Sequence, residues 1–155
     1  MARAENIVTS HTVHINAPAR VVWEVLIDWD NYHLWNTFCP GIKCGLQVGD
    51  EVHMQVRNPD TGETFPVLEY LVACDPEQLL SWEQRPTPEN MDAARRDQYI
   101  TAIDDNRCSY FTTDIFLGLN QDTIMQEHGA WVKNAFDQVA LDLKRRAEEL
   151  HGCRR

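Results

Sequence analysis

The spacing of apolar positions along the chain changes three times, from strand-like to helical, back to strand-like, and finally to helical again. Residues 8–16 (VTSHTVHIN) alternate between apolar and polar side chains, which predicts a β-strand. Residues 17–29 (APARVVWEVLIDW) then place apolar side chains on one helical face, and Pro18 suits the first turn of a helix. Residues 30–35 (DNYHLW) predict a second, short helical turn.

From about residue 42 to residue 117 the sequence alternates again, and short polar stretches interrupt it. The stretches at 58–63 (NPDTGE), 75–78 (DPEQ) and 104–107 (DDNR) contain residue types that tolerate tight turns. Strands joined by hairpin turns pair antiparallel with their chain neighbours. Together with the first strand, this region predicts one antiparallel sheet of about seven strands.

The last predicted element is a long amphipathic helix over about residues 122–150. This segment contains no proline, its apolar residues recur at spacings of three and four, and its other face is charged. At roughly 1.5 Å per residue such a helix is about 43 Å long. A coiled coil would show the same stripe, but the sheet upstream has an apolar face that this helix can cover. We therefore expect a curved sheet around one long helix, with a hollow between them and the short helices at one end.

Charge and hydropathy exclude several partners. The net charge is −10, from 14 basic and 24 acidic residues, so nucleic acid and anionic lipid headgroups are repelled. No stretch approaches the roughly 20 apolar residues of a membrane span, and residues 1–16 lack an apolar signal core. We expect a cytoplasmic protein of one domain, residues 1–155 with a core of about 8–150, that binds neither nucleic acid nor membrane and is a monomer or a homodimer.

The five cysteines, Cys39, Cys44, Cys74, Cys108 and Cys153, include no CxxC pair. Their odd number and irregular spacing argue against a disulfide framework and a zinc ribbon, so free thiols are expected. The chain also lacks a Ser-His-Asp spacing, a phosphate-binding loop and an HExxH motif. We therefore expect no metal site and no cofactor.

Asp114 is the first candidate catalytic residue. In an alternating strand it shares a face with Tyr110, Thr112 and Phe116, so it faces the hollow if Phe116 does. Burial in an apolar cavity raises the proton affinity of a carboxylate, which suits a general acid or base. The alternatives are an ion pair with Arg96 and exposure to solvent on the other face.

His128 is the second candidate catalytic residue, because it lies on the apolar stripe of the long helix. An imidazole there can move a proton near neutral pH, and a hydrogen-bonded histidine in the core is the alternative. The expected ligand-binding residues are apolar and hydrogen-bonding side chains on the inward faces. They are Met54, Trp82, Gln98, Ile100, Tyr110, Thr112, Val132 and Phe136.

Five stretches of the chain occur in an order and spacing found in a known family. They are HINAPARVVWEVLIDWDNYHLWNTF (14–38), VGDEVHMQV (48–56), DPEQLLSW (75–82), TDIFLG (113–118) and KNAFDQVALDLKRRAEE (133–149). Over residues 10–150 the chain resembles the SRPBCC superfamily, which includes START domains and polyketide cyclase/dehydrase-like proteins. It departs from the family pattern at Thr37, which replaces a proline, at Asp114, where glutamate is common, and at 96–98, where a histidine is common.

The resemblance implies the α+β helix-grip fold, in which a curved seven-stranded antiparallel sheet wraps around a long C-terminal helix. Two short helices lie between the first two strands. It also implies an internal cavity with one end closed by Trp35, Asn36 and Phe38, which join the expected ligand-binding residues. Plain core packing is the alternative for these three.

The function that the resemblance implies is binding of a small hydrophobic molecule, aromatic or polyketide-like. The protein would then catalyse the cyclisation or dehydration of this molecule, or a related lyase or isomerase reaction, in secondary metabolism. Such a reaction would need only the shape of the cavity and acid/base help, without a cofactor. A non-catalytic carrier or sensor of the same kind of ligand is one alternative. An interaction domain like the heat-shock ATPase activators of this superfamily is another.

Overall fold

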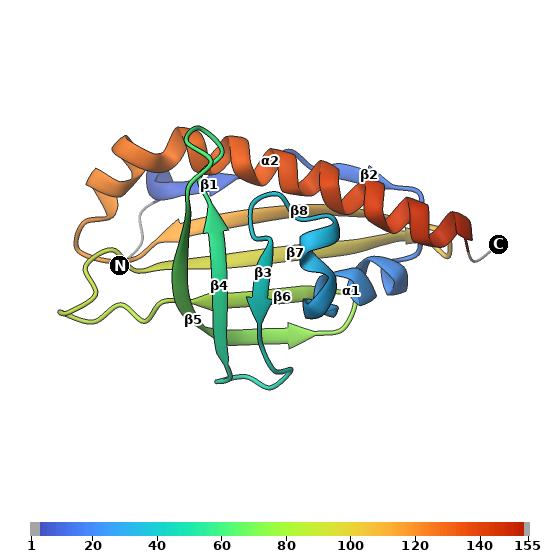
Figure 1. Ribbon diagram of the computed structural model, residues 1–155, viewed down its shortest axis with the longest axis horizontal. Coiled ribbons are helices and arrows are strands. Elements are labelled where there is room, and N and C mark those ends of the chain that lie inside the picture. The colour runs from blue at the N-terminus through green and yellow to red at the C-terminus, as the bar shows by residue number, and fades with distance from the viewer. Residues whose placement is uncertain (1–3, 154–155) are drawn as a thin grey trace.

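The computed structural model describes residues 4–153, which form a curved antiparallel sheet with one long helix along it (Figure 1). Within this range the sheet has eight strands in the spatial order β1-β8-β7-β6-β5-β4-β3, and β2 also pairs with β8. The strands are β1 (Ile7–Thr9), β2 (Val13–Ile15), β3 (Gly41–Lys43), β4 (Glu51–Arg57), β5 (Thr64–Asp75), β6 (Leu79–Glu83), β7 (Ala94–Asp104) and β8 (Arg107–Phe116). The helices are η1 (Ala4–Asn6), α1 (Ala19–Ile27), η2 (Trp29–Leu34) and α2 (Gln121–Cys153). The expected domain of residues 1–155 extends beyond the described range at both ends.

The expected helix-grip fold is confirmed, with eight strands in the described range rather than seven. The first expected strand is divided into β1 and β2, which both pair with β8. Ser10 lies at the division. Its backbone N–H donates to the carbonyl of Thr112 at 2.9 Å, and its hydroxyl accepts from the N–H of Thr112 at 3.0 Å. A side-chain oxygen here takes the place of a backbone carbonyl, which interrupts the ladder.

Strand β5 changes partner along its length. Its first half, Thr64 to Tyr70, pairs with β4, and its second half, Tyr70 to Asp75, pairs with β6. The register shifts between Leu71 and Ala73, which marks a β-bulge, and a bulge bends its strand and increases the twist. Strands β3, β4 and the first half of β5 therefore cross the direction of β6, β7 and β8, as Figure 1 shows.

The sheet opens beside the first half of β5, because the pairing with β6 begins only at Tyr70 among the described residues. Pro66 lies in this half, opposite Gln55 of β4. Proline has no N–H to give to a second neighbour, so it is tolerated where the strand has a free edge. The opening leads to the space between the sheet and α2.

Helix α2 confirms the predicted long helix, and it begins one residue earlier and ends three residues later than the expected 122–150. Its C-terminal half packs into the main core against α1, and its N-terminal half packs into a smaller apolar cluster. The buried residues of the C-terminal half are Val139, Ala140, Leu143 and Ala147. Those of the N-terminal half are Val132, Ala135 and Phe136, which pack with Val8 and Phe116.

Helices α1 and η2 are fastened to each other and to α2. The hydroxyl of Tyr32 donates to the carbonyl of Leu26 at 2.5 Å, which joins η2 to α1. Thr37, the residue that replaces the family's proline, donates to Asp142 Oδ2 from its N–H at 3.2 Å and from its hydroxyl at 2.7 Å. These bonds hold the chain that follows η2 against α2.

Three further properties concern the described part of the chain. No helix between residues 4 and 153 is long and apolar enough to cross a membrane. Over the same range, no three His, Cys, Asp or Glu side chains come together in a way that could hold a metal ion. Cys39, Cys44, Cys74 and Cys108 are free thiols, whereas the expectation for Cys153 lies outside the described side chains.

Candidate functional site

A pocket of about 330 Å³ lies between the opened sheet and the N-terminal half of α2. Inward-facing residues of β4 to β8 and one face of α2 line it. Pockets for small molecules have volumes of about 300–1,000 Å³, so this one suits a ligand at the small end of that range. Most of its lining is apolar, and Glu69, Arg96 and Asp114 lie among the apolar side chains.

Aromatic rings form much of the apolar wall. Phe38 and Phe136 contact edge to face, with ring centroids 5.4 Å apart and planes at 85°. Trp82 and Trp131 add two indole surfaces to the lining. Rings offer large flat areas at low cost in side-chain entropy, so this wall favours a flat ligand.

Arg96 is the buried cation of the pocket. Strand β7 places it opposite Asp114 of β8 and Trp82 of β6, and only 5% of its surface is exposed. Its Nε donates to the hydroxyl of Thr112 at 3.1 Å, and its guanidinium carbon lies 4.4 Å from the centre of the Phe136 ring. Among the described residues, its Nη2 has no hydrogen-bond partner and no carboxylate oxygen lies within 4.0 Å of the guanidinium.

Two carboxyl groups share the pocket with Arg96. Burial raises the pKa of Asp114 to about 7, against the opposing effect of the Arg96 charge. Burial raises the pKa of Glu69 to about 8, and the charge of Asp114 adds to the rise. Both side chains are half-buried and face the pocket. Interacting carboxyls titrate as a pair, so at least one of them holds a proton near pH 7.

A layer of buried polar side chains lies behind the pocket wall. The hydroxyl of Tyr110 donates to Gln98 Oε1 at 2.8 Å, and the hydroxyl of Thr112 donates to the carbonyl of Asp97 at 2.8 Å. Burial raises the pKa of Tyr110, so this phenol stays protonated. Through its bond to Arg96, Thr112 helps to hold the guanidinium in place.

His128 lies on the α2 side of the pocket and is partly exposed. The indole Nε1–H of Trp131 donates to His128 Nδ1 at 2.9 Å. An indole nitrogen only donates, so His128 Nδ1 accepts and the neutral ring carries its proton on Nε2. The Trp131 bond therefore sets both the tautomer and the orientation of this imidazole.

Several residues singled out in the sequence do line the pocket. They are Asp114, His128, Phe38, Met54, Trp82, Val132 and Phe136. Strand alternation and the helical stripe assign a side chain to the inner face, and these positions lie where that face is open. Their roles in catalysis or ligand binding stay predictions.

Six other candidates lie in the packed core instead of the pocket lining: Trp35, Asn36, Gln98, Ile100, Tyr110 and Thr112. Trp35 packs edge to face on Tyr32 at 5.1 Å, and Asn36 accepts from the N–H of Cys39 at 2.7 Å. The alternation along β7 and β8 identifies the inner face correctly. It does not reveal which end of each strand is covered by the main core.

Glu69, Arg96 and Trp131 are three of the lining residues that were not among the candidates. Glu69 lies at an inward position of β5, between the inward residues Val67 and Leu71. A single charged residue among apolar inward residues is a sequence signal that could have identified it as a pocket residue. Arg96 was considered only as an ion-pair partner of Asp114. Trp131 precedes Val132 on α2, and no sequence pattern indicated that it would contact the imidazole one turn earlier.

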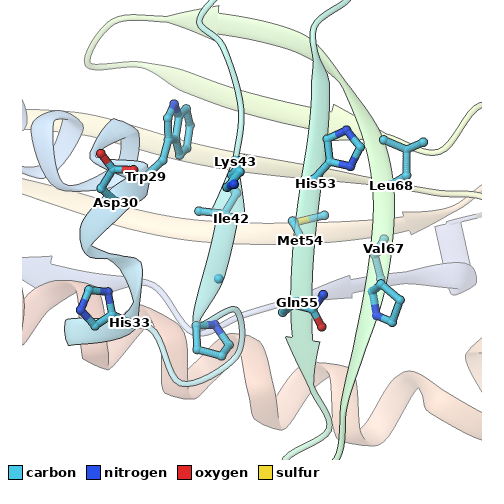
Figure 2. Close-up of a pocket in the computed structure, with 13 residues that line it drawn as sticks. Trp29, Asp30, His33, Ile42, Lys43, His53, Met54, Gln55, Val67 and Leu68 are labelled. Carbon is cyan, nitrogen blue, oxygen red and sulfur yellow. The ribbon is translucent and has the colours of Figure 1, made fainter.

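A larger hollow of about 590 Å³ lies beside η2, along strands β3 to β5. Figure 2 shows Trp29, Asp30 and His33 on one side of it and His53, Gln55 and Leu68 on the other. His53 is exposed and pairs with Glu51 at 2.7 Å, and the other polar side chains here are exposed as well. No buried polar atom without a partner lies in this hollow among the described residues. Its polar groups are those of a solvated face, so the inner pocket is the better candidate.

Comparisons with known proteins agree with this architecture. A family model described as polyketide cyclase / dehydrase and lipid transport matches residues 6–148. No curated protein has a sequence detectably similar to this chain.

Several solved structures are similar in fold. Zhui aromatase/cyclase from Streptomyces sp. R1128 has 20% identity over 92% of this chain and 93% of that chain, with a TM-score of 0.74. A START superfamily protein from Mycobacterium smegmatis has 13% identity over 93% and 98% of the two chains, with a TM-score of 0.68. The di-domain ARO/CYC StfQ from the steffimycin biosynthetic pathway has 12% identity, covering 98% of this chain and 53% of that chain, with a TM-score of 0.67. At identities this low, the structural similarity shows a common fold alone.

Proposed function

Because the chain belongs to the polyketide cyclase / dehydrase and lipid transport family, we propose that its inner pocket binds a small aromatic or polyketide-like molecule and catalyses its dehydration or cyclisation. The observation that supports this most is the presence of Glu69 and Asp114, two carboxyl groups with raised pKa values, in one largely apolar pocket. Similar folds in aromatase/cyclases are consistent with it.

The two carboxyl groups suit proton transfer at neutral pH. An ordinary carboxyl group is ionised there and is a poor acid. The pKa of about 7 at Asp114 and of about 8 at Glu69 bring both groups close to the working pH, where acid–base catalysis is most effective. Asp114, with the lower pKa, is the base, and Glu69, with the higher pKa, is the acid.

Dehydration of a β-hydroxy ketone then needs only these two groups. The Asp114 carboxylate removes a proton from the carbon next to the carbonyl, and that electron pair forms the new double bond. The bond from carbon to the hydroxyl oxygen breaks, and Glu69 gives this oxygen its proton, so that water leaves. The products are a conjugated ketone and water. The proton now on Asp114 returns to Glu69, and the pair is ready for another turnover.

The aromatic wall supplies the other part of the proposal. A flexible chain held against Phe38, Trp82 and Phe136 spends more time in a compact, reactive shape, which lowers the entropic part of the barrier. His128 lies nearer to solvent, with its Nδ1 engaged by Trp131. We assign His128 a hydrogen bond from its Nε2–H to an oxygen of the substrate, because the bond from Trp131 occupies Nδ1.

A model substrate tests the proposal directly. The aldol adduct of naphthaldehyde and acetone carries a flat ring and a β-hydroxy ketone, and its dehydration gives a conjugated product that is followed by absorbance. We expect the protein to accelerate this reaction. Asp114→Asn and Glu69→Gln should each lower kcat by about 10²- to 10⁴-fold with little change in substrate affinity, and His128→Phe should also lower kcat.

Matched controls are the exposed carboxyl groups of Asp105 and Glu63, whose variants Asp105→Asn and Glu63→Gln should keep full activity. If the adduct binds but is never dehydrated faster than in buffer, the catalytic part of the proposal is wrong and the protein is a carrier. The same conclusion follows if the pocket variants change affinity alone.

A further inference from the structure

Arg96 has more hydrogen-bonding capacity than its described surroundings use. A guanidinium group carries five N–H donors. The Nε–H is bonded to Thr112, whereas Nη2 is buried without a partner among the described residues. Arg96 is more than nine-tenths buried and lines the inner pocket. It is therefore an unpartnered buried donor on the pocket wall.

The aromatic neighbours of Arg96 stabilise its charge without accepting its hydrogen bonds. Phe136, Phe38 and Trp82 lie around the guanidinium, with its carbon 4.4, 5.5 and 6.0 Å from the respective ring centres. Ring faces attract a cation, but they are poor substitutes for an oxygen acceptor. An unpaired buried donor costs about 1–3 kcal/mol, and a charged one costs more.

Neither acid of the pocket, Asp114 or Glu69, forms a short ion pair with Arg96. No carboxylate oxygen of the described residues lies within 4.0 Å of the guanidinium. Because the pKa values of Asp114 and Glu69 are about 7 and about 8, both groups are largely protonated near pH 6. Below neutral pH the guanidinium is then the main buried charge of the pocket lining.

We propose that the pocket binds its ligand as an anion, through a charged oxygen on a flat ring system that is held by the N–H groups of Arg96. The oxygen belongs to a carboxylate, a phenolate or an enolate, because all three present the same acceptor to a guanidinium. The ring packs on the aromatic wall of Phe38, Trp82 and Phe136. This inference rests on the proposed function, since it names the class of molecule that the same pocket accepts.

Naphthoate and naphthamide test the proposal, because they share a ring system and a shape and differ in charge. At about pH 6 the protein should bind naphthoate about tenfold or more tightly than naphthamide. In Arg96→Met the affinity for naphthoate should fall by about 10- to 100-fold, while that for naphthamide should change by less than about threefold. Calorimetry and quenching of tryptophan fluorescence measure both affinities.

Two further variants control for charge and for folding. Arg95→Met removes the same charge from the next residue of β7, whose guanidinium pairs with Asp97 at 3.1 Å outside the pocket, and it should leave naphthoate affinity unchanged. Arg96→Lys keeps the charge without the planar fork, and it should keep part of the preference for naphthoate. Circular dichroism shows whether each variant is folded.

The pH dependence gives an independent readout. Raising the pH from about 6 to about 9 ionises Asp114 and Glu69, so naphthoate affinity should fall about tenfold or more, while naphthamide affinity should stay level. The double variant Asp114→Asn/Glu69→Gln should remove this dependence.

Other titratable groups near Arg96 or in the lining are Tyr32, Cys39, Tyr110, Asp92 and His128. Burial raises the pKa of Tyr32 and Tyr110 above the ordinary value and that of Cys39 to about 12, so these three stay neutral through most of this range. His128→Gln and Asp92→Asn should leave the fall in affinity in place.

The outcomes separate this inference from the proposed function. Equal affinities for the two ligands in the wild type, or equal losses in Arg96→Met, would overturn the anion proposal and leave the pocket as a ligand site. Failure of both ligands to bind would overturn both. Dehydration of the neutral aldol adduct is measured separately, so loss of the anion preference does not decide whether the carboxyl pair is catalytic.

Discussion

At the scale of single residues, the pocket is unusual in keeping a guanidinium and two acids close together without a short ion pair. Arg96 of β7 is buried against rings. Asp114 on the adjacent β8 and Glu69 on β5, beyond β6, have raised pKa values. Each of these three groups costs stability when it is charged in a largely apolar site. Such a cost is typical of functional sites rather than of core packing.

Replacing Arg96 by methionine should stabilise the protein. The buried charge has no carboxylate within 4.0 Å among the described residues, and an apolar side chain of similar length avoids its desolvation. We expect Arg96→Met to raise the free energy of unfolding by about 1–3 kcal/mol near pH 6, as measured by urea denaturation. Arg95→Met is the comparison and should lower it, because Arg95 pairs with the buried Asp97. A destabilised Arg96→Met would mean that the arginine holds the core together.

Stability should fall as the pH rises from about 5 to about 8.5. The folded-state pKa values of Asp114 and Glu69, about 7 and about 8, exceed their ordinary values of 3.8 and 4.5. The native state therefore holds protons that the unfolded chain releases, and this stabilising difference is lost as the pH rises through the folded-state values. We expect a loss of about 2 kcal/mol or more.

The double variant Asp114→Asn/Glu69→Gln isolates this effect in the same urea experiment, because its curve should be flatter by that amount. Asp104 and Glu148 have lowered pKa values, so their contribution is lost only at more acid pH and does not interfere. Identical pH profiles for the wild type and the double variant would show that the two acids titrate normally.

At the scale of elements, the first strand is divided, β5 is bent and the segment after η2 is anchored to α2. The bend of β5 opens the sheet beside the pocket. The period-two alternation is sufficient to predict β4 to β8 and their inner faces, because alternation is a local property of a pleated strand. The division at Ser10 and the bulge after Leu71 depend on which hydrogen bonds are available from a neighbouring strand. Those bonds exist only after the strands have paired.

The connection between Thr37 and Asp142 should matter for stability, because Asp142 is buried and receives two hydrogen bonds from Thr37. Thr37→Val removes the hydroxyl and leaves part of a buried carboxylate unpaired, so the free energy of unfolding should fall by about 1–3 kcal/mol. Thr37→Ser keeps the hydroxyl and should stay within about 0.5 kcal/mol of the wild type. A larger loss in Thr37→Ser than in Thr37→Val would point to the methyl group of Thr37 instead of its hydroxyl, and thermal unfolding distinguishes them.

At the scale of the whole molecule, the two ends of α2 differ in packing. The C-terminal half joins the main core with α1 and most of the strands, whereas the N-terminal half has only a small apolar cluster and the pocket beneath it. Local stability follows the extent of such packing. The pocket end should therefore open more readily than the end that α1 covers.

Hydrogen exchange measures this difference. Backbone amides of residues 121–136 and of the free-edged part of β5, residues 64–69, should exchange faster than those of residues 137–150. Bound naphthoate should slow the first two regions selectively, since it fills the pocket that they border. Uniform protection along α2, or uniform slowing by the ligand, would contradict this division of the molecule.

The sequence by itself determined the antiparallel sheet, the long C-terminal helix and the inward faces of the strands, because each follows from a short period of apolar side chains. Its resemblance to a known family implied the helix-grip fold. It also made Asp114 and His128 candidates on the apolar faces, and the family resemblance implied that Phe38 helps to close the cavity. Only the tertiary structure decided which inward positions border a pocket and which are covered, and it placed Glu69 and Arg96 beside Asp114. The reason is physical: these three residues come from β5, β7 and β8, and the bend of β5 brings them together. Exclusion of water raises the proton affinities of Asp114 and Glu69, and no local pattern encodes either effect.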